Sequence, residues 1–318
     1  MRIALDAMGG DFAPNAIIEG ALLAAKELTE EVKLVLVGIK DTIEAILKDF
    51  GYEGEQLEIV HANEVVEMGD NPTKALSQKP QSSIAIGYHL LQTGKVDAFC
   101  GAGNTGAMHV GAMFSIKPIE GVLRPALISH VPRVDGSVGI LLDVGANTDC
   151  KPEVLNQFGQ LGYLYAKHVL EVAHPKVALM NLGEEEKKGN LHAQAAHQLL
   201  KENDQINFVG NIEGRNLFFP DKADVIVCDG FTGNIVLKMA ESIYDIAVQR
   251  GIQDEFFDHL NYEDIGGSPI LGINGNVIIG HGISSAIAVR NMLLLAKKMA
   301  EVNLSVSIKN ALSSTVSN

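Results

Sequence analysis

Residues 224–238 read DVIVCDGFTGNIVLK and join a strand, a polar turn and a helix without a gap. The segment VIVC is continuously apolar, as strands buried on both faces of a parallel sheet tend to be. The turn that follows contains two glycines and Asp229, a residue type that commonly caps the first turn of a helix. Apolar side chains then recur at helical spacing over residues 234–249. A strand, a turn and a helix in this order are the building block of an α/β protein.

The same alternation of short β-branched runs and longer amphipathic stretches continues along the chain in both directions. It predicts an α/β fold with a mostly parallel, Rossmann-like sheet flanked by helices. The expected strands are residues 2–7, 33–37, 57–60, 98–101, 126–130, 139–143, 176–181, 205–209, 224–228 and 277–280. The expected helices are residues 14–30, 82–93, 153–172, 191–202, 234–249 and 285–301.

The organisation along the chain is uniform apart from one stretch. We find no internal repeat, linker or break in composition, and therefore expect a single α/β domain over residues 1–318. Residues 234–262 instead read as helix, Gly251 and helix with no strand between, which predicts a helical insertion that projects from the sheet. The polar tail NALSSTVSN, residues 310–318, is expected to fray.

Composition narrows the classes of partner and the location. The net charge of −14 and the absence of tryptophan argue against a nucleic-acid partner and weaken attraction to anionic membranes. Cys100, Cys150 and Cys228 are widely spaced without a CxxC pair, as expected of buried thiols in a reducing compartment. The apolar run after Met1 is too short for a secretory signal, and polar residues interrupt residues 96–116, so a cytoplasmic location is expected.

Nearly every expected strand ends in a short polar turn that is rich in glycine. Ligands of open α/β sheets bind outside the carboxyl ends of the strands, so these turns predict one ligand cleft. The turns are DAMGGD at 6–11, GAGNTG at 101–106, DVGANTD at 143–149, NLGEEEKKGN at 181–190, GNIEG at 210–214, CDGFTGN at 228–234 and GHGISS at 280–285.

Each turn taken alone has a plain alternative. DAMGGD is equally typical of an ordinary turn with an aspartate cap. The helix start at Asn104 and Thr105 offers free backbone N–H groups to an anion. The pattern GxGxxG at 101–106 is weak evidence for a dinucleotide, because no acidic ribose ligand follows at the expected spacing. NLGEEEKKGN is either a solvated charged turn or the carrier of a lysine that binds an oxyanion.

The sequence lacks the motifs of serine hydrolases and of zinc enzymes. The sequence has no GxSxG nucleophile elbow, no HExxH motif and no cluster of cysteine and histidine with zinc-ligand spacing. We therefore expect neither a metal site nor a bound cofactor.

Read together, the turns are similar to those of the phosphate acyltransferase (PlsX) family. The similar segments follow the family order over nearly the whole chain. They are DAMGGDFAP at 6–14, SSI at 82–84, AGNTGA at 102–107, RPAL at 124–127, LLDVGAN at 141–147, NLGEE and KGN within 181–190, NFVGNIEGR at 207–215, residues 224–238, GGSPILG at 266–272 and HG at 281–282. Three segments depart from the family pattern: residues 77–80 contain one basic residue where a basic run is usual, Gly101 replaces a common serine, and Gly280 and Ile283 alter the flanks of the turn at His281.

The resemblance implies a fold similar to those of isocitrate dehydrogenase and phosphotransacetylase, and a homodimer in the cytoplasm. It implies a reversible reaction in which fatty acyl-[acyl-carrier-protein] and inorganic phosphate give acyl phosphate and free carrier. The acyl phosphate would pass to a membrane glycerol-3-phosphate acyltransferase, on the way to phosphatidic acid and phospholipid.

The resemblance also suggests roles for single residues. Phosphate is itself nucleophilic, so the protein has to position it and to stabilise an oxyanion rather than supply a covalent nucleophile. Lys188 and Asn234 are expected to be catalytic, nearest the reacting carbonyl and phosphate. The expected phosphate- and substrate-binding residues are Asp6, Gly9, Gly10, Asp11, Ser82, Ser83, Asn104, Thr105, Asp143, Asn147, Asn190, Asp229 and His281.

Two surface features have open interpretations. Lys117, Arg124 and Arg133 lie in an acid-poor stretch and form either a docking patch for the acidic acyl carrier protein or scattered surface charge. The apolar residues near the tip of the helical insertion are interpreted first as a dimer interface, and otherwise as a cover for the acyl groove or a weak peripheral membrane contact. These residues are Ile252, Phe256, Phe257 and Leu260.

Two other functions compete with this one. A phosphotransacetylase-like enzyme that uses short acyl-CoA shares the chemistry, although the motifs fit it less well. A non-catalytic acyl-carrier or lipid-binding protein would not need polar residues at every turn.

Overall fold

The strands expected from the sequence all form in the computed structural model, which describes residues 1–315. One further strand, β10 (Ser268–Leu271), is not predicted, because Pro269 and the glycines around it are typical of a turn. Where the sequence leads us to expect one domain, the contacts divide the chain into two compact units. Unit 1 consists of Met1–Lys117 and Tyr262–Asn303, and unit 2 of Pro118–Asn261 with the chain from Leu304 onward.

The strands of unit 1 have the order β3-β2-β1-β4-β11-β10. All are parallel to their neighbours except β10, which is antiparallel to β11. The carboxyl ends of β1, β4 and β11 therefore lie side by side at one edge of the sheet. The bounds are β1 (Arg2–Asp6), β2 (Lys33–Gly38), β3 (Leu57–His61), β4 (Ala98–Gly101) and β11 (Asn276–Ile279).

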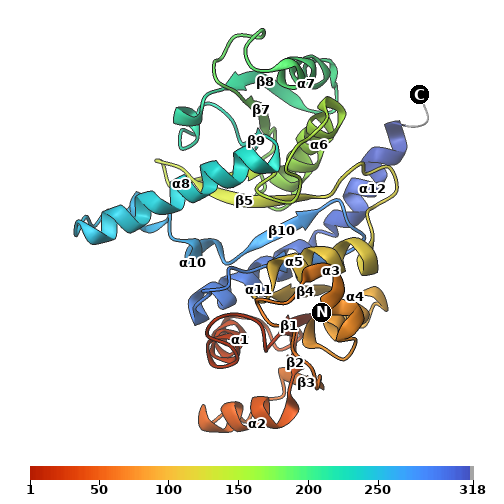
Figure 1. The fold of residues 1–318 in the computed structure, drawn as a ribbon. Coiled ribbons are helices and arrows are strands. Elements are labelled where there is room, and N and C mark those ends of the chain that lie inside the picture. Colours follow the sequence, from red (N-terminus) through yellow and green to blue (C-terminus); the bar gives the residue numbers. More distant parts are fainter. Residues whose placement is uncertain (316–318) are drawn as a thin grey trace. The chain divides into compact units, whose positions relative to one another are not determined.

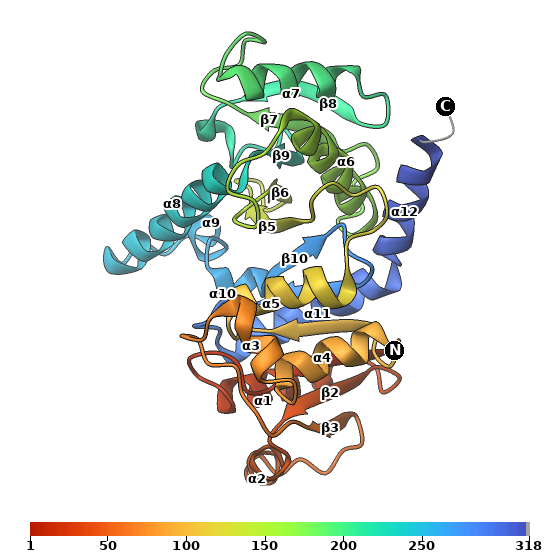
Figure 2. The ribbon, with the colours of Figure 1, turned by 45° about the vertical axis from the view of Figure 1, so that its right-hand side comes forward.

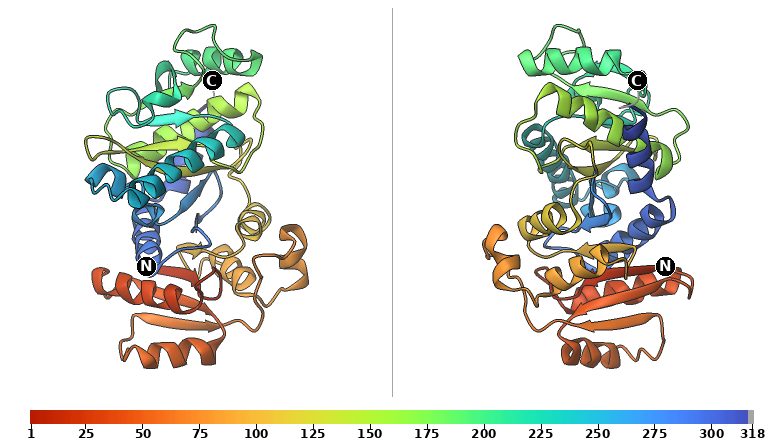
Figure 3. Two further views of the ribbon diagram at one scale, coloured as in Figure 1. Left: turned by 60° about the vertical axis from the view of Figure 1, so that its left-hand side comes forward. Right: turned by 90° about the vertical axis from the view of Figure 1, so that its right-hand side faces the viewer.

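The helices of unit 1 pack closely because glycines lie at the contacts. In α1 (Asn15–Glu27), a Cβ on Gly20 would lie 2.5 Å from the Cβ of Val289 in α11 (Ala286–Glu301). The helix α2 (Lys40–Asp49) lies against β3 (Figure 3). The remaining elements of unit 1 are α3 (Pro72–Gln78), α4 (Ser83–Gln92), α5 (Thr105–Gly111) with the π-helical turn Ala112–Ile116, and α10 (Tyr262–Ile265).

The strands of unit 2 have the order β5-β6-β9-β7-β8. The first pair is antiparallel and the others are parallel, so the carboxyl ends of β6, β9 and β7 are neighbours at one edge. The bounds are β5 (Ala126–Pro132), β6 (Val138–Leu142), β7 (Lys176–Met180), β8 (Asn207–Ile212) and β9 (Val225–Val227).

Helices cover the strands of unit 2 (Figure 2). The helix α6 (Pro152–His168) packs against α7 (Leu191–Glu202), where a Cβ on Gly159 would lie 2.7 Å from Leu200. A short 3-10 helix, η2 (Gly214–Asn216), follows β8. Residues 310–315 of the polar tail, which we expected to fray, belong to a helix. The helix α12 (Leu304–Thr315) contacts α6 and buries Leu304 and Ile308, while residues 316–318 lie outside the described part of the chain.

The expected helical insertion consists of one long helix and one short helix. The helix α8 (Gly230–Gln249) has 20 residues and extends away from the strands of unit 2 (Figure 1), and α9 (Glu255–Asp258) follows it. Leu260 is buried, and the ring of Phe256 packs edge to face on Phe218 at 5.4 Å. These two side chains are therefore used within unit 2, whereas Ile252 is exposed.

Within residues 1–315, none of the helices has the length and apolar character required to cross a bilayer. The three cysteines are buried free thiols, as the sequence predicts.

Candidate functional site

The turns that follow β1, β4 and β11 touch one another in unit 1. The backbone N–H of Asp11 donates to the carbonyl of Gly282 at 2.7 Å. Gly10 has a φ of +119°, and a Cβ on Gly9 would lie only 2.6 Å from the Cα of Gly103. Glycine is required at both positions, for the backbone conformation of Gly10 and for the close approach at Gly9. The structure thus brings three of the predicted turns together through backbone contacts.

Asp6 is buried beneath this junction rather than exposed to a ligand. Its Oδ1 accepts a hydrogen bond from the backbone N–H of Met8 at 3.0 Å. Among the described residues, its Oδ2 receives no hydrogen bond of good geometry, although the Ser83 side chain and the Gly9 backbone lie beside the carboxyl group. Burial raises the pKa of this carboxyl group above its usual value. The expected role in binding substrate is therefore replaced by one in shaping the turn of Gly9.

Asp6→Asn is expected to gain stability relative to the wild type as the pH rises from 4 to 8. The pKa of Asp6 is higher in the folded than in the unfolded protein, so ionisation above the unfolded pKa favours the unfolded wild type. Asparagine does not ionise, so the difference in unfolding free energy between the two proteins should grow with pH. Urea unfolding at several pH values measures it.

Asp70→Asn is a control with the opposite sign, because a hydrogen bond from Lys79 lowers the pKa of Asp70. This variant should lose stability relative to the wild type only as the pH rises up to the usual pKa of an aspartate, so the series for this control starts well below pH 4. Parallel pH curves for Asp6→Asn and the wild type would contradict the assigned burial of Asp6.

Two other predicted residues of unit 1 serve as helix caps. The Oδ1 of Asn104 accepts from the backbone N–H of Ala107 at 2.9 Å and caps α5. Its Nδ2 lies 3.0–3.1 Å from three carbonyls of the preceding loop, those of Glu67, Met68 and Asp70. Ser82 is fully buried and caps α4 in the same way. The side chain of Asn104 is thus occupied within the protein, and the predicted anion contact through the backbone N–H groups of this helix start stays a prediction.

Of the remaining predicted residues in this unit, Ser83 is buried, whereas Asp11, Thr105 and His281 are exposed at the turns. The backbone carbonyl of His281 accepts hydrogen bonds from the N–H and the Oγ of Ser284, which shapes the turn before α11. The Nδ1 of His281 accepts a hydrogen bond from the N–H of Ile283 at 3.4 Å.

In unit 2, the centre of the polar cluster is the buried carboxylate of Asp143. Five N–H groups donate to it: the backbone amides of Leu127, Gly145, Ala146 and Asn147, and the side-chain amide of Asn147, at 2.6–3.2 Å. Converging amide dipoles of this kind stabilise a negative charge without a cation. Asp143 therefore builds the turn after β6 and has no free side to offer a substrate.

This turn packs directly on the first turn of α8. Asn147 accepts a hydrogen bond from the N–H of Gly230 at 2.8 Å, and a Cβ on Gly233 would lie 1.9 Å from the carbonyl of Asp143. Asp229 caps α8 through Thr232 at 2.7 Å. Asn234 is exposed, and its Nδ2 donates to the carbonyl of Val144 at 3.3 Å. One amide hydrogen of Asn234 thus holds the side chain in place and the other is available to a ligand.

Lys188 lies in the loop of residues 181–190, which follows β7. Its side chain is 46% exposed, and its Nζ lies 3.7 Å from Glu185 Oε1. The Nδ2 of Asn181 donates to the carbonyl of Lys188 at 3.1 Å and closes the base of the loop. Asn190 caps α7 through Ala193. Asn181 is not among the residues predicted from the sequence, although its position directly after an apolar strand is a signal.

The proposed docking patch does not form as expected. The guanidinium of Arg133 is 5% exposed and pairs with Asp224 at 3.1 Å, so Arg133 cannot dock a partner. Lys117 is exposed in unit 1 and Arg124 is exposed in unit 2. Burial raises the pKa of Cys150 to about 12, and Arg124 opposes this shift while Asp143 and Asp229 add to it. Arg124 directly precedes Pro125, whose carbonyl accepts a hydrogen bond from the Nδ2 of Asn147 at 2.8 Å, so Arg124 lies beside the turn after β6.

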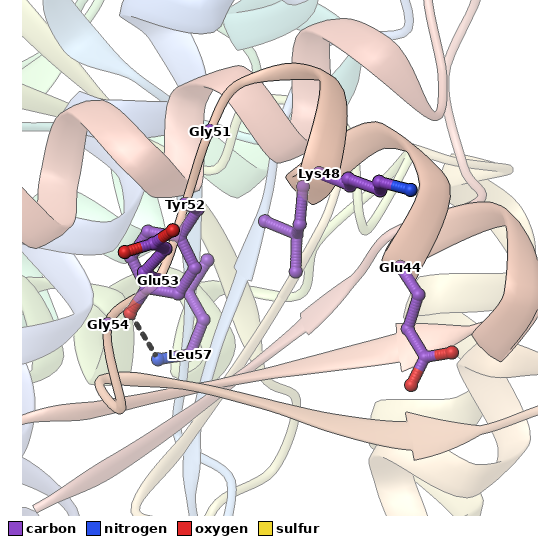
Figure 4. Close-up of a pocket in the computed structure, with 8 residues that line it drawn as sticks. Glu44, Lys48, Gly51, Tyr52, Glu53, Gly54 and Leu57 are labelled. Atoms are coloured by element: carbon purple, nitrogen blue, oxygen red, sulfur yellow. Dashed lines mark hydrogen bonds between the residues drawn. The ribbon is translucent and has the colours of Figure 1, made fainter.

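A pocket elsewhere in unit 1 has no predicted residue in its wall (Figure 4). It lies at the C-terminal end of α2, where the hydroxyl of Tyr52 accepts a hydrogen bond from the N–H of Leu57 at 3.1 Å. Its lining residues are Glu44, Leu47, Lys48, Gly51, Tyr52, Glu53, Gly54 and Leu57. Within residues 1–315, no group of three or more histidine, cysteine, aspartate or glutamate side chains is arranged to hold a metal ion.

Solved structures with a similar fold are phosphotransacetylases. The enzyme from Staphylococcus aureus has a TM-score of 0.65 at 18% identity and covers 94% of each chain. That from Streptococcus pyogenes also has a TM-score of 0.65, at 17% identity, covering 95% of this chain and 94% of the other. This similarity confirms the predicted α/β fold of the phosphotransacetylase type.

Sequence comparison identifies the family. Residues 1–307 match the family described as fatty acid synthesis protein. The phosphate acyltransferase of Dictyoglomus turgidum is 42% identical over 98% of both chains. That of Salinibacter ruber is 41% identical over 99% of this chain and 98% of the relative. Identity at this level over nearly the full length shows that the chain is an enzyme of the phosphate acyltransferase family.

Proposed function

We propose that this enzyme forms acyl phosphate reversibly from fatty acyl-[acyl-carrier-protein] and inorganic phosphate. The observation that supports this most is the pair of donors at neighbouring strand ends in unit 2. The exposed ammonium of Lys188 lies in the loop after β7. Asn234 lies after β9, the strand that pairs with β7, and only one of its two amide hydrogens is bonded to Val144. Two such donors suit a carbonyl that becomes an oxyanion.

In the proposed reaction, a phosphate oxygen attacks the thioester carbon and the carbonyl electrons move onto oxygen. Lys188 and the free N–H of Asn234 stabilise the negative charge of this tetrahedral intermediate. The carbonyl then re-forms, the C–S bond breaks, and the carrier leaves as a thiolate that takes up a proton. Placing the two reactants together contributes up to about 7–11 kcal/mol, and one oxyanion donor about 3–4 kcal/mol.

We further propose that the turns of unit 1 bind the phosphate. Their exposed donors are the hydroxyl of Thr105, the imidazole of His281 and the backbone around Gly10. Asn104 and Asp6 would act indirectly, since both are buried and hold the turns in shape. Gly9 keeps the turns close enough for this.

A trapping experiment tests the reaction. The protein is mixed with phosphate and either palmitoyl-acyl-carrier-protein or acetyl-CoA, and hydroxylamine converts acyl phosphate to a hydroxamate. Hydroxamate from the carrier substrate alone supports the proposal. Hydroxamate from acetyl-CoA alone would instead indicate the phosphotransacetylase activity, and binding of the carrier without product would contradict both.

Arg124→Glu is expected to raise the KM for the acyl carrier protein about fivefold and to leave kcat unchanged. Arg124 is the exposed cation of the predicted patch that lies beside the turn after β6, and the carrier is acidic. Reversing one charge at the rim of an interface changes the interaction by about 1 kcal/mol. Initial rates at varied carrier concentration measure this effect.

Lys48→Glu is the matched control for Arg124, because Lys48 is exposed on α2 in the wall of a pocket that contains no predicted site residue. An equal rise in KM for both variants would show a general charge effect and would contradict docking at Arg124.

We also propose where the product is used and in what state the enzyme acts. The product would serve a membrane glycerol-3-phosphate acyltransferase in phospholipid synthesis, and the enzyme would act as a cytoplasmic homodimer with at most a weak membrane contact. An exposed apolar face on α8 supports the dimer, because Phe231, Met239 and Ile246 are each more than half exposed in the single chain.

A further inference from the structure

The loop that carries Lys188 is held by side-chain amides along its backbone. The carbonyls of residues 185, 187, 188 and 189 each accept a hydrogen bond from such an amide. Asn181 lies within the loop itself and Gln194 lies on α7 just after it. Asn211 is the third donor; it lies on β8, 26 residues from Glu185, whose carbonyl it contacts at 2.9 Å. It is thus the one amide of the three that fixes the loop to a separate strand.

A β-bulge directs Asn211 toward the loop. In the pairing of β7 with β8, Val177 faces Phe208 and Ala178 faces Gly210, so Val209 is an extra residue. Gly210 has a φ of +103°, a conformation that favours glycine. Side chains on a regular strand alternate between faces, so residues 208 and 211 would lie on opposite sides. The bulge instead brings both to the face of β8 that meets α7, where each of them contacts His197. The helix α7 and the strand β8 lie side by side in Figure 2.

His197 of α7 contacts both of these side chains. Its ring packs edge to face on Phe208 at 5.1 Å, and its Nδ1 lies 3.0 Å from Asn211 Oδ1. Because the Nδ2 of Asn211 donates to Glu185, its Oδ1 accepts from His197, and the Nδ1 of His197 carries the hydrogen. Both residues are 5% exposed. The amide of Asn211 therefore has one orientation, with its N–H directed at the loop.

We infer that Asn211 is a positioning residue, which holds the loop of Lys188 in place through the carbonyl of Glu185. This inference rests on the proposed role of Lys188. The carboxylate of Glu185 also pairs with the Lys188 ammonium at 3.7 Å, so a shift of the Glu185 backbone moves the group that is paired with that ammonium. The acidic neighbours of Glu185 are held as well, Glu184 by Asn216 and Glu186 by Lys201. The turn GNIEG, which the proposed reaction does not use, thereby gains a function.

Asn211→Asp tests the inference because it removes one interaction and keeps the other. Aspartate has nearly the same shape and still accepts from His197, but it has no N–H to donate to Glu185. We expect kcat for acyl phosphate formation to fall about tenfold, as misplacement of a catalytic group does, with the KM for phosphate and for the thioester changed less than about twofold. Amide hydrogen exchange should become faster in residues 183–189 and stay unchanged elsewhere.

Asn203→Asp is the matched control, at the other end of α7. Asn203 also makes two amide hydrogen bonds, with Asn156 at 2.9 Å and with Gln205 at 3.1 Å, but it does not contact the loop. Its kcat should equal that of the wild type. Wild-type kcat and exchange in Asn211→Asp would overturn the inference. So would a loss of kcat accompanied by faster exchange throughout unit 2, which would indicate a purely structural role.

Lys188→Ala, assayed alongside, separates this inference from the proposed function. If Lys188→Ala has the kcat of the wild type, Lys188 is not catalytic. Faster amide hydrogen exchange confined to residues 183–189 in Asn211→Asp would then still show that Asn211 fixes this loop.

Discussion

Lys188→Ala and Asn234→Ala are each expected to lower kcat by about 100- to 1000-fold, which is the usual effect of removing one donor to an oxyanion. Lys188 presents an exposed ammonium after β7, and Asn234 presents the amide hydrogen that Val144 does not use. If both stabilise the tetrahedral intermediate rather than the bound substrate, KM should change little. Hydroxamate formation from palmitoyl-acyl-carrier-protein and phosphate measures both constants.

Lys187→Ala provides the control, because Lys187 is the exposed lysine next in the same loop. Its turnover should stay within about twofold of the wild type, since a surface charge of this kind contributes little. Equal losses in Lys187→Ala and Lys188→Ala would indicate a general need for positive charge in the loop. Near-normal turnover in both Lys188→Ala and Asn234→Ala would exclude them as catalytic residues.

The strands and the long helices could be predicted because each has a clear pattern over its own length. β10 could not, since Pro269 and its flanking glycines argue locally for a turn, whereas pairing with β11 makes the segment a strand. α12 was missed for a similar reason. Its polar composition hides Leu304 and Ile308, which are one helical turn apart and are buried where α12 meets α6. Both β10 and α12 form because they pack against segments that are distant in the sequence.

The position of the site residues at strand ends followed from the sequence, but the direction of their side chains did not. Asn104 is held by carbonyls 34 to 37 residues earlier, and Arg133 is buried against Asp224, 91 residues later. Asn211 reaches the loop of Lys188 only through a bulge, which a sequence pattern does not reveal. A strand-end motif therefore locates a candidate site, while long-range contacts separate residues that face a ligand from those that build the turn.

Asp143→Ala is expected to lower the free energy of unfolding by about 4–5 kcal/mol, close to the total stability of many domains. Alanine would leave five N–H groups without their acceptor at a site that is 0% exposed. Each buried donor left unpaired costs about 1–3 kcal/mol, and part of this cost is recovered when water or neighbouring groups rearrange. Urea unfolding followed by circular dichroism measures the change.

Asp143→Asn and Asp135→Ala are two variants against which the loss of unfolding free energy in Asp143→Ala can be compared. Asparagine keeps one acceptor oxygen but turns an N–H₂ group toward the remaining donors, so its loss should be intermediate, about 2–3 kcal/mol. Asp135 lies in an exposed turn, where it accepts hydrogen bonds from Ser137 alone, and its replacement by alanine should cost less than about 1 kcal/mol. If Asp143→Ala were no less stable than Asp135→Ala, the five hydrogen bonds to Asp143 would not hold the turn after β6. The support that this turn gives to α8 and Asn234 would then have to come from the close contact of Gly233 with the carbonyl of Asp143.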